Sequence, residues 1–195
     1  MIEVEKKFQP TEEQLAAFLK DAEFLGGKEY TDTYYDLPDF SFFKSERRLR
    51  RRNNDYELKI QISNSKDNKA VYNEEITEPE KILERMGFDK NDSLERITRE
   101  VLIPLCVIKT KRKKYKMGEF HIDLDETDFG FNILEIELMV LDEGGAIEAE
   151  RKIINLAESF GFEIKKLPGK VKECLRITRP EIYKVLHPEN KPIPI

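Results

Sequence analysis

Charged and apolar residues alternate along many short segments of this sequence. At the N-terminus, Glu3 and Glu5 alternate with Ile2 and Val4. Successive side chains of a β-strand point to opposite faces, so this pattern predicts strands with one charged face and one apolar face. Segments of this period cover residues 2–8, 29–36, 47–52, 55–62, 70–77, 107–116, 119–125, 132–141 and 170–177.

Helices are predicted between several of these strands. Thr11 and Gln14 have the spacing of a capping box, and apolar residues then recur at helical spacing until Gly26 and Gly27. Each further helix is indicated by apolar residues at helical spacing, in two cases with Pro at its start or Gly at its end. These helices are expected over residues 79–87, 94–101 and 153–161, followed by a last turn from residue 180.

Short polar turns at residues 63–69, 117–118 and 126–130 join neighbouring strand segments. Strands joined in this way pair antiparallel as a meander. No internal repeat and no linker rich in Pro or Gly divides the sequence, which we interpret as a single domain over residues 1–195. The tail 187–195 contains three prolines and is expected to be extended.

The chain has 195 residues, of which 39% are hydrophobic and 37% are charged, and its net charge is −5. Its 12 Phe and 7 Tyr favour a packed core over disorder. We expect a cytoplasmic protein, because the sequence has no signal segment and no run near ~18 apolar residues. Cys106 and Cys174 lack C-x-x-C spacing and are interpreted as reduced thiols in or near the core.

Carboxylates are grouped with carboxylates on the charged faces. Three segments carry such same-face pairs, namely Glu3 with Glu5, Asp123 with Asp125 and Glu135 with Glu137. Residues two apart on a strand are separated by about 6.6 Å, so each pair costs about 2.5 kcal/mol at an effective dielectric near 20 and little in bulk water. The pairs therefore lie either on a solvated face or in a site where divalent cations offset their repulsion.

Basic side chains are grouped in the same way and require a polyanion as their partner. Arg50 and Arg52 share one face, and Arg112, Lys114 and Lys116 share another. Arginine binds phosphate oxygens bidentately, and a hard cation such as Mg²⁺ bridges carboxylate and phosphate oxygens. The sequence therefore predicts an α+β protein, in which a closed antiparallel β-barrel with a charged interior is flanked by amphipathic helices.

Several ordered motifs resemble those of one known family. The opening Glu3-Val4-Glu5-Lys6-Lys7 is similar to the E-x-E-x-K signature of the CYTH superfamily, the triphosphate tunnel metalloenzymes. Further similar segments follow in family order at residues 32–36, 49–52, 57–59, 123–130 and 135–137. Within the superfamily the chain most resembles the thiamine triphosphatase branch, through its I-E-V-E-x-K-F, D-T-Y-Y-D and D-L-D-x-x-D-F-G segments.

The resemblance implies a tunnel of about eight antiparallel strands and a role for each motif residue. The implied metal ligands are Glu3, Glu5, Asp123, Glu135 and Glu137. The implied triphosphate-binding residues are Lys7, Arg50, Arg52, Lys59, Arg112 and Lys170, with Asp125 and Glu75 as supporting residues. The implied reaction is hydrolysis of the terminal phosphate with Mg²⁺ or Mn²⁺ as cofactor, in which Lys and Arg position the phosphates and stabilise charge.

One departure from the family pattern leaves the substrate open. Vertebrate members of the thiamine triphosphatase branch carry a Trp before the Leu-Arg-Arg-Arg stretch, where an aromatic face can hold the cationic thiazolium ring. Here this position is Arg48, which would repel a thiazolium unless Phe42, Phe43 or a Tyr replaces the missing ring. Thiamine triphosphate is the first candidate, inorganic tripolyphosphate the second, and class IV adenylate cyclase activity a third.

A binding function without catalysis is a further alternative. The basic run over residues 109–116 could contact nucleic acid, or the tunnel could hold polyphosphate without hydrolysing it. The net charge of −5 disfavours general nucleic-acid binding. We therefore expect a small-molecule triphosphate as partner, no nucleic acid or membrane, and a monomer, because the sequence shows no coiled coil or long apolar edge.

Overall fold

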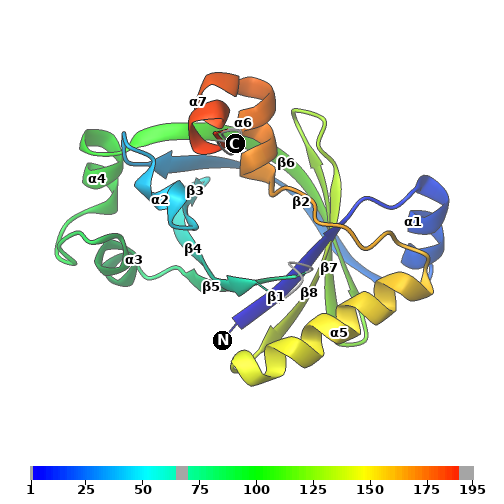
Figure 1. Cartoon of the computed structure of the whole chain (residues 1–195). Coiled ribbons are helices and arrows are strands. Elements are labelled where there is room, and N and C mark those ends of the chain that lie inside the picture. Colours follow the sequence, from blue (N-terminus) through cyan, green and yellow to red (C-terminus); the bar gives the residue numbers. More distant parts are fainter. Residues whose placement is uncertain (1, 65–69, 189–195) are drawn as a thin grey trace, which may run out of the picture.

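The strands form one closed antiparallel barrel in the computed structural model, which describes residues 2–64 and 70–188 (Figure 1). Their order around the barrel is β1-β5-β4-β3-β2-β6-β7-β8, and β8 pairs with β1 to close it. The strands are β1 (Ile2–Phe8), β2 (Glu23–Asp36), β3 (Arg47–Arg52), β4 (Asp55–Asn64), β5 (Val71–Ile76), β6 (Ile103–Met117), β7 (Phe120–Thr127) and β8 (Ile133–Val140). The expected α+β barrel is confirmed.

Seven helices occur in the described part of the chain and lie around the barrel (Figure 1). They are α1 (Glu12–Leu19), α2 (Ser41–Lys44), α3 (Pro79–Met86), α4 (Leu94–Glu100), α5 (Glu143–Ser159), α6 (Lys170–Thr178) and α7 (Pro180–Leu186). The capping box of α1 is present, with Thr11 accepting from the backbone of Gln14 and the Gln14 side chain accepting from the backbone of Thr11.

The apolar faces of the strands point outward and pack against these helices. Helix α5 covers β1 and β8, where Ile153 packs in one cluster with Val4 and Ile136 (Figure 1). Helices α3 and α4 cover β3 and β4 in a second cluster, and α6 and α7 pack with β6 in a third. The first two clusters lie outside the barrel. In the third cluster, Cys106 and Ile108 are on the same face of β6 as Arg112, so α6 and α7 pack on the inward face of β6. The charged side chains occupy the rest of the barrel interior.

Strand registers bring the charged positions of neighbouring strands together. Glu5 of β1 is opposite Glu137 of β8, and Lys7 is opposite Glu135. Because β1 is the first strand of the chain and β8 is the last, this pairing exists only when the barrel closes. The register therefore joins motifs that are separated by more than a hundred residues in the sequence.

One predicted element is wrong. Residues 170–177 were predicted to be a strand, but they form α6. Val171, Cys174 and Leu175 are buried at helical spacing, whereas Ile177, which the alternation placed on the same face as Leu175, is exposed. A short segment with apolar residues at both two- and four-residue spacing fits either structure, and here packing against β6 selects the helix.

Other boundaries also differ from the predictions. Gly26 and Gly27 were expected to end the first helix, but they lie inside β2, where Gly26 has a φ of 129° at a register shift with β6. Helix α5 begins at Glu143, ten residues before the predicted start, and α2 was not predicted. The predicted turn 63–69 and tail 187–195 fall largely on residues 65–69 and 189–195, outside the described residues.

Among the described residues, no helix is both long enough and apolar enough to cross a membrane.

The barrel's outer core can be tested with one pair of leucine substitutions. Leu134 on β8 is fully buried between β8 and α5, so Leu134→Ala should lower the free energy of unfolding by about 2–5 kcal/mol. Leu141, just after β8, is 87% exposed, so Leu141→Ala should change it by less than about 0.5 kcal/mol. Urea denaturation of both variants measures the change in the free energy of unfolding. Equal changes would contradict the burial of Leu134 against α5.

Candidate active site

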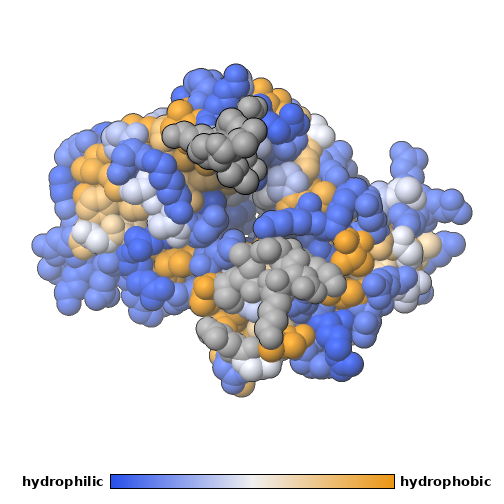
Figure 2. All heavy atoms as spheres, in the orientation of Figure 1, coloured by the Kyte–Doolittle hydropathy of each residue, from blue (hydrophilic) through white to orange (hydrophobic). Residues whose placement is uncertain are grey.

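The interior of the barrel contains a cavity of about 850 Å³. In the space-filling view, hydrophilic residues surround a hollow near the centre of the molecule (Figure 2). Twelve of the thirteen side chains predicted from the sequence as site residues line this cavity. The thirteenth, Asp125, is fully buried behind it and pairs with Arg112 and Lys170. The structure therefore brings all the predicted residues together, while their chemical roles remain predictions.

The acidic wall of the cavity is formed by β1, β7 and β8. Glu3, Glu5 and Glu137 each offer a carboxylate oxygen, and these three atoms lie within 4.8 Å of one another. Asp123, Glu135 and Glu137 form a second such group with the same spacing. Glu137 belongs to both groups, because β8 pairs with β1 on one side and with β7 on the other.

Burial and mutual repulsion strongly perturb two of these carboxylates. Burial, opposed in part by Lys59, raises the pKa of Glu3 to about 7. Burial together with four neighbouring carboxylates raises the pKa of Glu137 well above its usual value. In the described part of the chain Glu137 has no ion pair with a Lys or Arg. Its charge is therefore the least compensated in the acidic wall.

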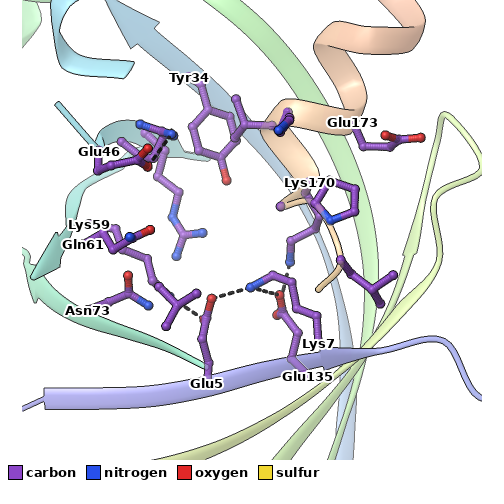
Figure 3. A pocket seen from close by; sticks show the side chains of 18 of the residues that line it. Glu5, Lys7, Tyr34, Glu46, Lys59, Gln61, Asn73, Glu135, Lys170 and Glu173 are labelled. Carbon is purple, nitrogen blue, oxygen red and sulfur yellow. Dashed lines mark hydrogen bonds and ion pairs between the residues drawn. The ribbon is translucent and has the colours of Figure 1, made fainter. Parts of the chain in front are cut away.

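Two lysines neutralise the other end of the acidic wall (Figure 3). Nζ of Lys59 on β4 donates to Glu3 and, at 2.8 Å, to Glu5. Nζ of Lys7 donates to Glu5 and lies 3.5 Å from Glu135. Burial alone would raise the pKa of Glu5, but Lys59 and Lys7 lower it to about 2. Both lysines therefore pair with carboxylates that the family resemblance gave as metal ligands.

Arg112 and Lys170 form a second cationic group, beside β7 and β8. Arg112 donates to Asp123, to Asp125 at 2.6 Å and to Glu135 at 2.9 Å. Lys170, the first residue of α6, donates to Asp125 and lies 3.4 Å from Glu135 (Figure 3). Lys170 lines the cavity with the other predicted residues, although the element that carries it was predicted wrongly.

Arg50 and Arg52 on β3 are held by Asp32 of β2, which sequence reasoning missed. Arg52 donates two hydrogen bonds of 2.8 Å to the Asp32 carboxylate, and Arg50 lies 3.8 Å from it. Asp32 is buried and directly opposite Arg52 in the β2–β3 register. The signal was present in the sequence, since Asp32 belongs to the D-T-Y-Y-D segment and shares a face with Tyr34.

Tyr30 was also missed, and it supports two of the predicted cations. Its ring lies 3.7 Å from the guanidinium of Arg52 and 5.8 Å from that of Arg112. An aromatic face attracts such cations and restricts where they lie. Tyr30 lies two residues before the D-T-Y-Y-D segment. Tyrosine is common in strands, so the sequence offered no specific signal for a role of Tyr30 in the site.

The basic run over residues 109–116 does not form one surface. Arg112 and Lys114 face the cavity, whereas Lys111 and Lys113 are exposed on the other side of β6. Further basic residues at the cavity come from the segment before α6 and from α6 itself, and sequence reasoning missed them. The segment before α6 has no strand or motif pattern, and residues 170–177 were predicted as a strand and not as a helix. These further basic residues are Lys165, Lys166, Lys172 and Arg176.

The acidic wall fits a hard divalent cation. Its two groups offer only carboxylate oxygens, the ligands that Mg²⁺ and Mn²⁺ prefer. The uncompensated charge of Glu137, shared by both groups, is what a cation would neutralise. The donor set and the charge of this wall therefore agree with the metal ligands expected from the sequence.

Comparison with known proteins gives the family. Residues 1–167 match the model of the CYTH domain. The chain belongs to the CYTH family. Thiamine-triphosphatase from Homo sapiens is 30% identical to it, over 95% of this chain and 89% of the human protein. The Macaca fascicularis thiamine-triphosphatase is 29% identical with the same coverage.

Solved structures share the CYTH fold at lower sequence identity. A Pyrococcus horikoshii protein superposes with a TM-score of 0.65 and 21% identity, covering 89% of this chain and 98% of its own. A Hippeastrum protein, described as having a dominant triphosphatase activity, has a TM-score of 0.56 and 16% identity, covering 94% and 95% of the two chains. These likenesses support the barrel architecture.

Because the carboxylates of the acidic wall repel one another, we expect that removing the charge of Glu137 stabilises the folded protein. Glu137 binds its proton more tightly in the folded chain than in the unfolded chain, where the pKa is near 4.5. The folded state therefore loses stability as the pH rises above about 4.5. In EDTA, Glu137→Gln should unfold at a higher temperature than the wild type at pH 8, with a smaller difference at pH 6.

The matched control is Glu126→Gln on β7, which removes one carboxylate from the exposed side of the same sheet. Its unfolding temperature should follow that of the wild type at both pH values. Thermal unfolding followed by circular dichroism measures all three proteins. A Glu137→Gln protein less stable than the wild type at pH 8 would show that Glu137 is compensated.

Proposed function

We propose that this CYTH protein is a divalent-metal-dependent hydrolase that removes the terminal phosphate of a triphosphate. The observation that carries the proposal is the pair of carboxylate groups sharing Glu137, which face Lys and Arg side chains across one cavity. Carboxylates for metal and cations for phosphate oxygens are the two components that phosphoryl transfer requires.

In this proposal the metal is held by Glu3, Glu5, Asp123, Glu135 and Glu137. When bound, Mg²⁺ or Mn²⁺ would neutralise phosphate charge and lower the pKa of a water molecule. The carboxylates would keep the metal at the cavity wall, where the register of β1, β7 and β8 holds them.

The basic residues would bind and orient the phosphate chain. Arg50 and Arg52 can each donate two hydrogen bonds to phosphate oxygens, and lysine contributes a point charge. Arg112, which already donates to Asp123, Asp125 and Glu135, would contribute mainly its positive charge. Tyr30 and Asp32 hold the guanidinium of Arg52 in place before substrate arrives. Such preorganised donors stabilise the charge that develops on the phosphates during hydrolysis without having to rearrange.

Thiamine triphosphate is the first candidate substrate. The support is the 30% identity to human thiamine-triphosphatase, which extends over 95% of this chain. Side chains of the motifs that resemble the thiamine triphosphatase branch also converge on the cavity.

Inorganic tripolyphosphate is the second candidate, and the position of Arg48 favours it. Arg48 lines the cavity, and its guanidinium lies 3.8 Å from the centre of the Phe43 ring. The aromatic face that could have replaced the missing Trp therefore already carries a cation. A thiazolium ring placed there would meet like charge, whereas an inorganic substrate has no such ring.

A substrate panel tests the proposed function. With Mg²⁺, the protein should hydrolyse thiamine triphosphate or tripolyphosphate with a higher kcat/KM than ATP, as measured by phosphate release. EDTA should abolish turnover, because the acidic wall would lose its metal. Turnover that persists in EDTA would contradict the metal requirement, and a strong preference for tripolyphosphate would overturn thiamine triphosphate as first candidate.

Two arginines on β3 provide a matched test of the phosphate-binding role proposed for the basic residues. Arg52 lines the cavity, so Arg52→Ala should lower kcat/KM for the preferred triphosphate by about 10- to 100-fold, chiefly through KM. Arg51 points to the other side of the strand, towards Asn54 and Tyr56, and Arg51→Ala should change kcat/KM by less than about threefold. Equal kinetics for both variants would place Arg52 outside the binding site.

A further inference from the structure

The end of the cavity opposite the acidic wall carries basic residues that the proposed triphosphate site does not use. Figure 3 shows Tyr34 and Glu46 across the cavity from Glu5 and Glu135. Arg48, which bonds to Glu46, lines the cavity together with Lys172 of α6 and His187 after α7. This end is therefore built from β3, α6 and the end of α7.

Arg48 is held in one position by four contacts. Its Nη1 donates to the backbone oxygens of Phe43 at 3.0 Å and Arg47 at 2.9 Å. Its Nη2 donates to Glu46 at 3.0 Å, and the guanidinium lies 3.8 Å from the Phe43 ring centre. A guanidinium fixed in this way is a preorganised donor for an anion entering the cavity.

Lys172 and His187 line the same cavity as Arg48, and the rings of Phe43 and His187 are in contact. Burial lowers the pKa of His187, and Lys172 and Arg48 lower it further, while Glu46 acts in the opposite direction. The imidazole packs on Tyr183 at 4.7 Å and on Phe43 at 5.9 Å between ring centres. Its Nε2 is buried without a hydrogen-bond partner in the described part of the chain.

The charge balance differs between the two ends of the cavity. The basic residues near the acidic wall pair with carboxylates, as Lys59 does with Glu3 and Glu5. Lys172 has no ion pair with an acidic side chain among the described residues. An anion between Arg48 and Lys172 would supply the missing partner, and it could accept from Nε2 of a neutral His187.

We propose that Arg48, Lys172 and His187 form a distal phosphate subsite, which extends the substrate class to linear inorganic polyphosphates of four or more phosphates. The inference rests on the proposed function and deepens its second candidate. The cavity, at about 850 Å³, lies in the upper part of the range of ~300–1,000 Å³ found for small-ligand pockets. The fourth phosphoryl group would lie at the distal subsite when the terminal one is at the acidic wall.

The reaction remains hydrolysis of one phosphoanhydride bond. The oxygen of water forms a bond to the terminal phosphorus, and the bond from that phosphorus to the bridging oxygen breaks. The shortened chain leaves with the bridging oxygen and its electron pair. The products are inorganic phosphate and a polyphosphate shorter by one unit, and the proton released from water passes to solvent.

Chain-length kinetics test the subsite. With Mg²⁺, wild-type protein should show a kcat/KM about tenfold higher for tetrapolyphosphate than for tripolyphosphate. Lys172→Gln should lower the value for tetrapolyphosphate about tenfold more than the value for tripolyphosphate, and Lys172→Arg should restore the advantage. Lys184→Gln removes the same charge from the exposed side of α7, away from the cavity, and should keep the wild-type ratio. Thermal unfolding confirms that each variant is folded.

Failure of the subsite and failure of the proposed function give different results. If both substrates are hydrolysed with equal kcat/KM and Lys172→Gln affects them equally, the subsite is wrong and the hydrolase proposal stands. If neither is hydrolysed, the hydrolase proposal fails, and calorimetry in EDTA decides the subsite. Tighter binding of tetrapolyphosphate than tripolyphosphate by wild type but not by Lys172→Gln would then support it, and equal affinities would overturn it.

Discussion

Like-charged carboxylates enclosed within a barrel are the constraint on which the rest of this structure depends. Glu5 faces Glu137 across the β1–β8 pair, and Asp123 faces Glu135 across the β7–β8 pair. Each contact is unfavourable in a medium of low dielectric unless cations compensate it. The inward lysines and arginines provide most of that compensation, which is why acidic and basic strand faces must both point inward. Helices α3, α4 and α5 pack on the apolar outer faces.

The ion pairs of the cavity suggest how the proposed metal and substrate would help each other to bind. Lys59 and Lys7 are bonded to Glu5, one of the carboxylates proposed to hold metal. A divalent cation at Glu5 would compete with these lysines and free their ammonium groups for phosphate oxygens. The carboxylates and the cations would thus exchange one set of partners for another, and the site would stay charge-balanced in both states.

Strand faces and motif residues were predictable from the sequence, because period-two alternation depends only on local backbone geometry. This reasoning located Glu3, Glu137 and Arg112 correctly at the cavity. It failed for α6, whose apolar spacing fits a strand or a helix until β6 is in place. It also missed Tyr30 and Lys172, whose positions follow from the approach of distant segments.

The sequence by itself determined that charges of one sign share strand faces, and from this we predicted a metal and a polyanion as their partners. Only the tertiary structure decided which carboxylates meet, because the meeting of Glu5 and Glu137 requires closure of the barrel by the first and the last strand of the chain. It also decided that Arg48 covers Phe43 and lines the same cavity as Lys172 and His187. Local alternation sets the direction of a side chain, whereas its neighbours are set by packing between distant segments.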